Sequence, residues 1–563
     1  MKNINESITF VNEHDDLNVL IKKFANKTKT VALCLNKKKK VLGIITIGDL
    51  RRLISKNSNF NLKISKVYIK SFFYIYENTP IHEINSKLFE FKKKNKKNKL
   101  NTIIILDKNK KFVGSIDEWQ VYNDLKFKNI CIVGLGYVGL PLLAHIGLKK
   151  GNCIGYDKKN VIENLKKNKL KFYEKNLKPT ISNLNKNKKI SFFHDLQKVK
   201  AEIYIICIGS YLENGKLNNK IFFQVLDELI KQNLKENDLL IMRGTVNVGF
   251  SRSVGKYIEK KTKGKLITGK NFHLSFFPER LIQGDALSEL SKIPQIISGY
   301  SDECKNYTLK LCSKIFPNNI IAESLEEAEI IKLASNSYRD LTFSFSNELF
   351  RICSKFNLDV SELISKANQG YQRNNIPLAS PGVGGSCLIK DPILFKFINK
   401  NTDGYSLGHL SRKINNKALS LVYKKLDYIR KKHFTKKFKI LIVGLAFKGE
   451  PETSDLRGSM SVELIKILKK NNINFKSYDD VLDKSKDFKY DKKYLNKINN
   501  SKNLSEYDII LFMNNNLTNV SIIDQNLKPV VNKKKFIFDC WNVFSSSKAD
   551  SLGYKYVSLG KIY

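Results

Sequence analysis

The sequence has no apolar run long enough to cross a membrane, and its N-terminus, MKNINESITF, lacks the apolar core of a signal peptide. The longest apolar runs, such as residues 203–208, have the length of a buried strand. These absences argue against an integral membrane protein and against a secreted one. We therefore expect a soluble protein without membrane insertion, located in the cytoplasm.

The sequence also has no CxxC pair, and its seven histidines form no cluster with the spacing of metal ligands. We therefore expect no metal site. The nine cysteines are scattered and odd in number, which predicts free thiols in a reducing compartment. Most of them, such as Cys131 and Cys207, lie in apolar segments and are expected to be small core residues. Only Cys387 has unusual neighbours.

Acidic residues are scarce: 53 Asp and Glu stand against 99 Lys and Arg, which gives a net charge of +46. Such an excess is typical of proteins that bind nucleic acid. Here, however, the lysines are spread over the whole chain and accompany asparagine, as in residues 92–99, without interleaved aromatic residues. We interpret the charge as a compositional bias at solvent-facing positions and expect no nucleic-acid partner. A positive field would still help to capture a diphosphate.

With 563 residues, the chain is too long for one core, and its pattern divides it into four regions. Residues 1–125 contain short strands and helices. Residues 126–322 alternate strands with helices, which predicts a doubly wound parallel sheet. Residues 323–430 begin with one long helix over 326–356 and continue with a Gly-rich ordered loop over 368–392. Residues 431–563 again alternate strands and helices.

Two stretches of the first region, 41–50 (VLGIITIGDL) and 112–122 (FVGSIDEWQVY), indicate an internal duplication. They resemble a pair of CBS motifs. Some CBS pairs bind adenine nucleotides through a Thr or Ser and an Asp three residues later, and Thr46 and Asp49 match this pattern. The second copy has Ser115 and Glu118 instead. The region is thus either an adenine-nucleotide regulatory module or a structural module without a ligand.

A dinucleotide-binding fingerprint follows the predicted strand at 130–133. Gly134, Gly136 and Gly139 form G-x-G-x-x-G, in which the first two glycines allow a tight turn near a pyrophosphate and the third allows close helix packing. Asp157 ends the next predicted strand, where a carboxylate accepts hydrogen bonds from both ribose hydroxyls. This pattern predicts NAD, although Lys158 next to it leaves NADP open.

The stretch 380–391 (SPGVGGSCLIKD) combines a glycine loop with a potential nucleophile, Cys387. A thiol attacks as the thiolate, and the loop N–H groups and Lys390 would favour that form. Asp391 could orient or deprotonate a water molecule. With Pro392 it also fits a helix N-cap followed by proline at the first position, and the sequence leaves both interpretations open.

Seven segments occur together in this order: GLGYVGLPLL, RGTVNVG, FPERLIQGDAL, EIIKLASNSYRD, GYQRNN, PGVGGSCLIKD and GLAFKGEPETSDLRGS. Over residues 128–563 the chain therefore resembles the UDP-glucose/GDP-mannose dehydrogenase family. The resemblance implies an α/β fold with two Rossmann-type doubly wound domains joined by a long central helix, preceded here by the CBS-like domain. It also implies NAD-dependent four-electron oxidation of a nucleotide sugar, from primary alcohol to carboxylate, for polysaccharide biosynthesis.

The resemblance assigns the catalytic roles. Cys387 is the nucleophile that carries a thiohemiacetal and then a thioester, and Asp391 positions or activates water. Lys332 and Asn336 stabilise oxyanions; four residues apart, they share one face of the predicted helix. Without the resemblance, that pair would be interpreted as a solvated polar face. Glu279 assists thioester hydrolysis, and Thr245 lies beside the nicotinamide.

The resemblance also implies two binding sets. The cofactor set is Gly134, Gly136, Tyr137, Val138, Gly139, Asp157, Gly209, Ser210 and Thr245. The substrate set is Glu279, Arg280, Lys332, Asn336, Arg373, Gly382, Gly384, Gly385, Ser386, Phe447, Lys448 and Arg457. In this family the arginine at Arg373 reaches a neighbouring subunit's site, which implies a homo-oligomer, at least a dimer, with the long helix as its interface.

The sugar is predicted less sharply, because two signals conflict. Residues 278–280 (PER) resemble members that act on UDP-N-acetylhexosamines, whereas Ser386-Cys387 and Lys390-Asp391 resemble the UDP-glucose enzymes. We expect a UDP-N-acetylhexosamine such as UDP-N-acetylmannosamine or UDP-N-acetylglucosamine, with UDP-glucose as the alternative. Two other functions stay open: a β-hydroxyacid dehydrogenase, and an adenine-nucleotide sensor built on an inactive dehydrogenase scaffold.

Overall fold

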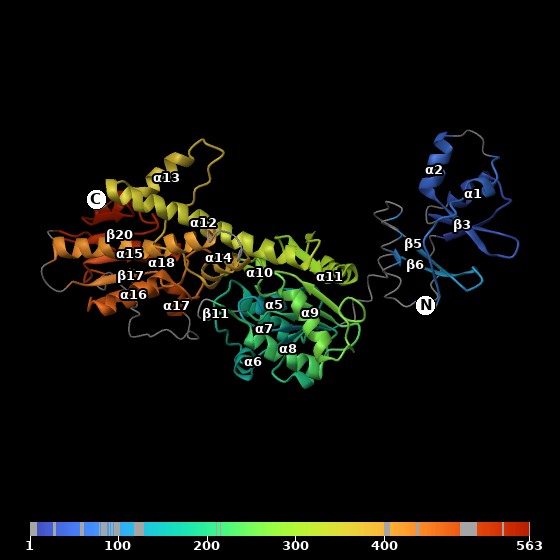
Figure 1. Cartoon of the computed structure of the whole chain (residues 1–563). Coiled ribbons are helices and arrows are strands. Elements are labelled where there is room, and N and C mark those ends of the chain that lie inside the picture. The colour runs from blue at the N-terminus through green and yellow to red at the C-terminus, as the bar shows by residue number, and fades with distance from the viewer. Residues whose placement is uncertain are drawn as a thin grey trace. The chain divides into compact units, whose positions relative to one another are not determined.

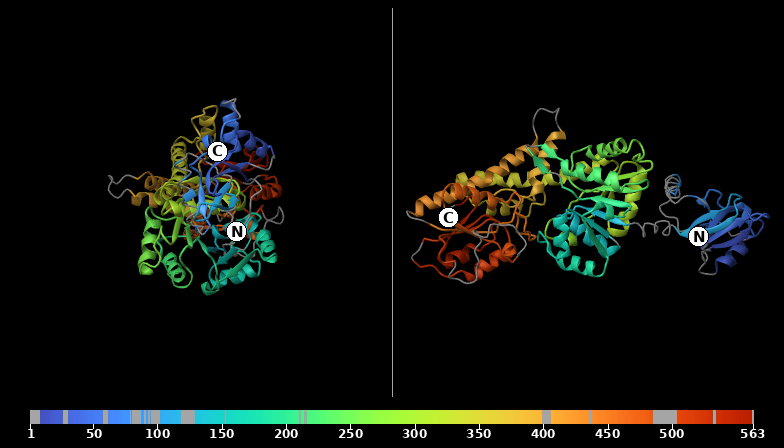
Figure 2. Two further views of the ribbon diagram at one scale, coloured as in Figure 1. Left: turned by 90° about the vertical axis from the view of Figure 1, so that its right-hand side faces the viewer. Right: turned by 90° about the horizontal axis from the view of Figure 1, so that it is seen from below.

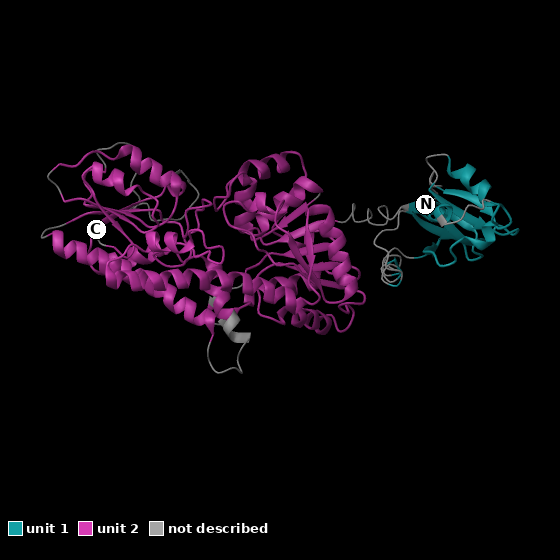
Figure 3. Cartoon of the chain, turned by 90° about the horizontal axis from the view of Figure 1, so that it is seen from above, with its two compact units in different colours: residues 1–128 teal, residues 129–563 magenta. Residues whose placement is uncertain are grey.

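The computed structural model forms two compact units, residues 1–128 and residues 129–563 (Figure 3). The residues that it describes are 8–25, 30–56, 61–77, 79, 87–88, 91, 94, 102–117, 129–151, 153–209, 211–213, 216–398, 406–434, 438–484, 504–531 and 534–561.

The first unit contains two three-stranded sheets of the same design. One has the order β1 (Ile8–Asn12), β2 (Val31–Leu35) and β3 (Val41–Thr46), with helices α1 (Leu17–Phe24) and α2 (Ile47–Lys56). The other has the order β4 (Tyr74–Tyr76), β5 (Thr102–Leu106) and β6 (Phe112–Asp117). In each sheet the first two strands are parallel and the last two antiparallel, with a register shift near the end of the middle strand.

The turns that join the antiparallel strands confirm the predicted internal duplication. In the first, Asn36 Oδ1 accepts hydrogen bonds of 3.0 Å from Lys38 N and Lys40 N. In the second, Asp107 Oδ1 accepts hydrogen bonds of 2.8 Å from Asn109 N and from the backbone N of residue 111. The same local sequence signal therefore builds the same turn twice.

The register of the two hairpins corrects the predicted match between the copies. Thr46 pairs with Val31 at the end of β3, and Asp117 pairs with Thr102 at the end of β6. Asp117, and not Ser115, therefore holds the place of Thr46 in the second copy. A shift of two residues keeps each side chain on the same face of the strand, so alternation alone did not reveal the error. Glu118 lies outside the described residues.

The second unit begins with an eight-stranded sheet of order β16-β15-β14-β13-β10-β7-β8-β9. Its strands are β7 (Ile130–Val133), β8 (Cys153–Tyr156), β9 (Ile190–Phe193), β10 (Ile203–Ile206), β13 (Leu239–Met242), β14 (His273–Phe276), β15 (Gln295–Gly299) and β16 (Asn319–Ile321). From β9 to β14 the strands are parallel in the order 3-2-1-4-5-6, which is the doubly wound order that binds dinucleotides. β15 runs antiparallel to β14, an addition that the sequence pattern did not predict.

Helices cover this sheet, and a short hairpin extends from it (Figure 1). The helices are α5 (Gly139–Lys149), α6 (Lys159–Lys166), α7 (Leu177–Lys186), α8 (Lys220–Gln232), α9 (Phe250–Lys261), α10 (Ala286–Glu289) and α11 (Asp302–Ile315); the hairpin is β11 (Tyr211–Glu213) and β12 (Lys216–Asn218). α5 follows the glycine fingerprint directly and is almost entirely buried.

The central helix α12 (Leu325–Phe356) has 32 residues and confirms the predicted helix over 326–356. It runs from the eight-stranded sheet toward the C-terminal domain (Figure 1), and α15 (Leu407–His433) lies alongside it (Figure 2). Two shorter helices, α13 (Val360–Asn368) and α14 (Ser386–Ile398), lie between them in sequence. The predicted loop over 368–392 is therefore shorter than expected and ends at Gly385.

The C-terminal domain is a second parallel sheet, of order β18-β17-β19-β20-β21. Its strands are β17 (Ile440–Val443), β18 (Phe475–Tyr478), β19 (Ile509–Phe512), β20 (Phe536–Asp539) and β21 (Lys555–Ser558), with helices α16 (Met460–Lys470), α17 (Asp480–Lys484), α18 (Leu517–Asn526) and α19 (Ser546–Ser551). The order 2-1-3-4-5 is also doubly wound, so the predicted second Rossmann-type domain is confirmed.

All nine cysteines lie within the described residues, and none of them forms a disulfide. Eight are buried, and Cys387 is half-buried. Within the described ranges, no helix is both long and apolar enough to cross a membrane.

Candidate active site

The glycine fingerprint forms the turn between β7 and α5. Gly134 has a φ of +95°, and a Cβ at Gly139 would collide with the carbonyl oxygen of Gly134, so both positions require glycine. A Cβ at Gly136 would meet no atom within 4 Å. The backbone is therefore open at the position where the fingerprint brings a pyrophosphate close, and the residues present fit a dinucleotide.

Asp157 lies at the end of β8 and is tied to the same turn. Its carboxylate accepts hydrogen bonds of 2.6 Å from Leu135 N and from Lys158 N. The loops that carry Val138, Gly209 and Thr245 follow β7, β10 and β13, which are neighbours in the sheet. The carboxyl ends of parallel strands meet at one edge, so the structure gathers these predicted cofactor residues there. Ser210 lies outside the described residues.

Tyr137, inside the fingerprint, contacts residues of both Rossmann-type domains of the second unit. Its ring stacks on Phe172 with centroids 4.2 Å apart, and the guanidinium of Arg457 lies 4.8 Å from its centroid. Arg457 belongs to the C-terminal domain and also donates a 2.6 Å hydrogen bond to Asp455. The cofactor turn and the predicted sugar-binding domain therefore meet at this tyrosine.

Lys332 and Asn336 lie on the face of α12 that turns toward the predicted catalytic residues. Lys332 is buried, with its Nζ 3.9 Å from Glu279 Oε2. Asn336 Nδ2 donates a 2.6 Å hydrogen bond to Asp391 Oδ2. The interpretation of this pair as a solvated face is therefore wrong. Burial lowers the pKa of Lys332, but Glu279, Cys387 and Asp391 outweigh it and hold that pKa above its ordinary value.

Cys387 lies in the first turn of α14, next to these residues. The first N–H groups of a helix have no partner within the helix, and they favour an anion at its N-terminus. Burial nevertheless raises the pKa of the Cys387 thiol above its ordinary value, and the carboxylate of Asp391 raises it further against Lys332. Lys390 lowers the pKa of the thiol, as the sequence predicted, and its Nζ also pairs with Asp391 Oδ1 over 2.7 Å.

Asp391 is fully buried and is not a helix cap. Helix α14 begins at Ser386, so Asp391 and Pro392 lie inside it, and the N-cap interpretation is wrong. The preceding glycine loop explains the early start of the helix, because Gly385 has a φ of +86° and turns the chain into it. Asp391 thus has one oxygen bonded by Asn336 and the other by Lys390.

The glycine loop packs closely against the C-terminal domain. A Cβ at Gly384 would collide with the carbonyl oxygen of Gly458, and one at Gly385 would lie 2.8 Å from the ring of Phe447. A Cβ at Gly382 would lie 2.7 Å from Met460 Sδ. The three glycines therefore bring the catalytic loop and the predicted sugar-binding domain into contact.

Two of the predicted basic substrate residues hydrogen-bond to backbone carbonyls, and a third is exposed. Lys448 Nζ donates a 2.5 Å hydrogen bond to the carbonyl of Gln283, and burial lowers the pKa of Lys448 to about 8 against the pull of Glu174. Arg280 donates to the carbonyl of Pro294 over 2.7 Å. Arg373, in contrast, is exposed, and no contact among the described residues joins it to the catalytic cluster.

Sequence reasoning missed three further residues on the same face of α12. Glu329 accepts hydrogen bonds from Gly249 N at 2.6 Å and Ser251 N at 2.8 Å, just after the loop of Thr245. Asp340 and Asn347 bond to α15 and to the glycine loop. The five polar residues of this face are Glu329, Lys332, Asn336, Asp340 and Asn347. They follow one another at spacings of three, four and seven, which place them on one face of a helix. This regular spacing of polar residues was the signal in the sequence that could have identified them.

Three models of one family match the second unit. The UDP-glucose/GDP-mannose dehydrogenase NAD-binding domain matches residues 128–318, the central domain 326–417 and the UDP-binding domain 441–546. A CBS domain model matches residues 2–56. The chain therefore belongs to the UDP-glucose/GDP-mannose dehydrogenase family, as its motifs predicted, with an added CBS domain. It is an NAD-dependent nucleotide-sugar dehydrogenase.

Individual relatives are similar over the same region. The UDP-N-acetyl-D-mannosamine dehydrogenase of Methanocaldococcus jannaschii is 26% identical over 438 residues, which is 77% of this chain and 96% of the relative. That of Campylobacter jejuni is 26% identical over 60% of this chain and 83% of the relative. Among solved structures, UDP-D-ManNAc dehydrogenase from Pyrococcus horikoshii has 23% identity, a TM-score of 0.64 and coverage of 77% of this chain and 99% of that one.

A UDP-glucose dehydrogenase from Pyrobaculum islandicum matches equally well in fold, with a TM-score of 0.64, 18% identity and coverage of 77% of this chain and 98% of that one. The fold is therefore common to enzymes with different sugars, and it does not select among them.

Proposed function

We propose that the protein oxidises the C6 alcohol of a UDP-N-acetylhexosamine, with UDP-N-acetylmannosamine as the first candidate, to the uronate. The observation that carries this proposal is the cluster of Lys332, Glu279, Asn336 and Asp391 around Cys387, in which Lys332 and Asp391 are buried. The names of the similar enzymes and the Pro278-Glu279-Arg280 segment favour the acetamido sugar. UDP-glucose is the alternative. The product would serve polysaccharide biosynthesis in the cytoplasm, where the free thiols are stable.

The first oxidation removes a hydride and a proton from the alcohol and leaves an aldehyde. NAD, when bound, supplies the hydride acceptor for both oxidations. Lys332 Nζ and Asn336 Nδ2 are positioned as donors to an oxygen that gains negative charge. Lys332 is buried, and a buried donor is effective because water does not compete with it. Thr245 follows β13 at the edge where the nicotinamide would lie.

The second oxidation passes through Cys387. Its thiolate adds to the aldehyde carbon, and the resulting thiohemiacetal loses a second hydride and a proton to become a thioester. Water then replaces the sulfur, which releases the carboxylate and restores the thiol. Asp391, held by Asn336 and Lys390, orients that water, and Glu279 assists the hydrolysis.

The test measures NADH formed from UDP-N-acetylmannosamine, UDP-N-acetylglucosamine and UDP-glucose, with Cys387→Ser as the control. With the wild type we expect two NADH for each molecule of the acetamido sugar. With Cys387→Ser we expect no four-electron oxidation. Two NADH from UDP-glucose alone would reassign the sugar. One NADH per substrate would favour the β-hydroxyacid dehydrogenase reaction, which needs no cysteine.

We further propose that the enzyme is at least a dimer that assembles through α12. Five large apolar side chains on this helix are exposed in the single chain: Tyr338, Phe345, Ile352, Phe356 and Ile330. The first three are seven residues apart and form one stripe, which a second copy would bury. Sedimentation should give a dimer for the wild type and a monomer for Phe345→Asp. In such a dimer Arg373 is free to reach the partner's site.

For the first unit we propose binding of an adenine nucleotide at Thr46 and Asp49. Asp49 Oδ2 accepts hydrogen bonds from Thr46 N at 3.0 Å and from Thr46 Oγ1 at 2.5 Å, so the two matched residues lie together. Titration of ATP and AMP into the full chain and into Asp49→Asn tests this site. Binding that changes turnover and is lost in the variant supports regulation. Binding without turnover of any nucleotide sugar would favour the sensor interpretation.

A further inference from the structure

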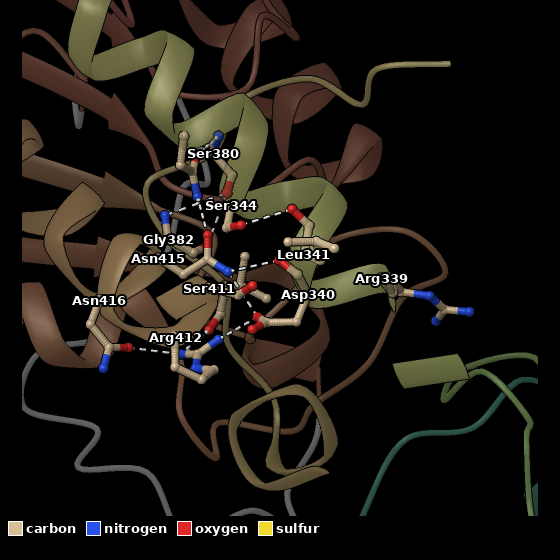
Figure 4. A network of polar contacts seen from close by, with 12 residues as sticks. Arg339, Asp340, Leu341, Ser344, Ser380, Gly382, Ser411, Arg412, Asn415 and Asn416 are labelled. Carbon is tan, nitrogen blue, oxygen red and sulfur yellow. Dashed lines mark hydrogen bonds and ion pairs between the residues drawn. The ribbon is translucent and has the colours of Figure 1, made fainter. Parts of the chain in front are cut away.

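Arg412, on α15, is a buried arginine that joins three parts of the site. Its Nη1 donates to Asp340 Oδ1 on α12 over 2.7 Å, and its Nη2 donates to the carbonyl of Val383 in the glycine loop over 3.2 Å and to Asn416 Oδ1 over 2.7 Å. Figure 4 shows the carboxylate of Asp340 between Arg412 and Asn415, whereas its neighbour Arg339 points away from the network.

A second chain of hydrogen bonds leads from Asp340 to Ser380, at the start of the glycine loop. Asn415 Nδ2 donates to Asp340 Oδ1 over 2.8 Å, and Asn415 Oδ1 accepts from Asn347 Nδ2 over 2.9 Å. Asn347 Oδ1 in turn accepts from Ser380 N over 2.9 Å, and Ser380 Oγ donates to the carbonyl of Gly382 over 3.1 Å. The network therefore holds the loop at Ser380 and at Val383, on either side of Gly382.

The ion pair between Asp340 and Arg412 is better suited to orienting the loop than to stabilising the fold. Asp340 is fully buried, and its Oδ2 has no hydrogen-bond partner among the described residues. Burial raises the pKa of Asp340 against the opposing effect of Arg412. A buried ion pair contributes little net stability compared with packed apolar side chains. A guanidinium fork, however, bonds a carboxylate and a carbonyl at fixed angles, which neither an apolar side chain nor lysine does.

The loop leads directly to the nucleophile. Cys387 follows Val383 by four residues, and the intervening Gly384 and Gly385 pack against the C-terminal domain. Asn336, one helical turn before Asp340, bonds Asp391 on the same short helix α14. The position of the thiol relative to Lys332 and Asp391 therefore depends on how firmly α12 and α15 hold Ser380–Val383.

We propose that Asp340 and Arg412 are positioning residues that align the Cys387 thiol with the aldehyde; the proposal rests on the cysteine mechanism given above. The first oxidation forms no bond to sulfur, so it tolerates a displaced thiol. The second oxidation requires the S–C bond. When the loop is displaced, the alcohol still yields an aldehyde and one NADH, and the aldehyde leaves before the thioester forms.

The test uses Arg412→Lys, which keeps the charge and loses the fork. The matched control is Arg430→Lys, because Arg430 lies on the same helix and pairs with Asp427 at the surface. In Arg412→Lys we expect NADH per sugar to fall from two toward one, with the missing sugar recovered as an aldehyde trapped by hydrazine. Complete oxidation should slow by about 10- to 100-fold, as a displacement of about 1 Å produces. The KM for NAD should not change.

A second readout needs no sugar: the rate at which iodoacetamide alkylates Cys387 should differ between Arg412→Lys and the wild type and be unchanged in Arg430→Lys. Asn416→Ala, which removes one acceptor of Arg412 and keeps the ion pair, provides a milder variant if Arg412→Lys folds poorly. Two NADH per sugar with an unchanged alkylation rate would overturn the proposal, as would a loss of activity that equals the loss of folded protein. Failure of the wild type on every nucleotide sugar would instead refute the proposed function, while the alkylation rates would still decide this inference.

Discussion

Asn336 on α12 donates a hydrogen bond of 2.6 Å to Asp391 on α14, and this contact joins the central helix to the helix of the nucleophile. Asp391 is fully buried, and its other oxygen is bonded by Lys390. The carboxylate therefore has one neutral and one charged donor. The neutral donor matters because it adds orientation without adding charge to a site that already contains Lys332.

The substitution Asn336→Asp replaces this amide donor by an acid. In Asn336→Asp two carboxylates would lie within hydrogen-bond distance, so the pair would hold one proton with a strongly raised pKa. Below that pKa the shared proton preserves the contact, and above it the two charges repel. We expect kcat of the variant to fall as pH rises from about 6 to about 9, a range in which ordinary carboxylates are already ionised.

Asn336→Ala is the control for that experiment. It removes the hydrogen bond without adding charge, so its loss of kcat relative to the wild type should be the same at every pH. Parallel pH profiles for the two variants would contradict the prediction.

The second prediction concerns the Cys387 thiol, whose pKa burial and Asp391 raise above the ordinary value. A raised pKa means that the thiol is mostly neutral at neutral pH and that the thiolate fraction grows with pH. The alkylation rate by iodoacetamide should therefore still be rising beyond about pH 8.5, where an ordinary thiol is half ionised. Lys332→Met should move the profile to still higher pH, because Lys332 opposes the increase. A profile that levels off below the ordinary thiol pKa would contradict this.

The third prediction compares two neighbouring glutamates on α12. Glu329 is buried and accepts from Gly249 N and Ser251 N, so Glu329→Ala leaves two buried N–H groups unsatisfied and should lower the free energy of unfolding by about 1–3 kcal/mol. Glu326 pairs with Arg252 near the surface, so Glu326→Ala should cost about 0–1 kcal/mol. Urea unfolding measures both. Equal losses would mean that Glu329 does not anchor the loop after Thr245.

The sequence predicted those features whose signal is local. Turn glycines, the acid at the end of β8 and the apolar period of α12 each involve residues close in the chain, and the structure agrees with them. The assignment of Lys332 and Asn336 to one face also follows from helical spacing alone.

The features that the sequence did not predict depend on pairs that are distant in the chain. Asp340 and Arg412 lie 72 residues apart, and each alone is an ordinary charged residue on a helix. The effect of Lys390 on the thiol was predicted because the two residues are close in sequence, but its ion pair with Asp391, in the helix that begins at Ser386, was not. The match between the CBS copies failed for a similar reason, since strand register is set by pairing across the sheet.

The last prediction separates the two roles of the fingerprint glycines. A Cβ at Gly139 would collide with Gly134 O and approach Cys207, so Gly139→Ala must move α5 away from β7 and should lower the melting temperature. A Cβ at Gly136 meets no atom of the described protein within 4 Å, so Gly136→Ala should melt like the wild type. The added methyl group would instead occupy the space in which the pyrophosphate approaches the backbone, and calorimetric titration should show weaker NAD binding. If Gly136→Ala bound NAD as the wild type does, the open side of this turn would not be the pyrophosphate site.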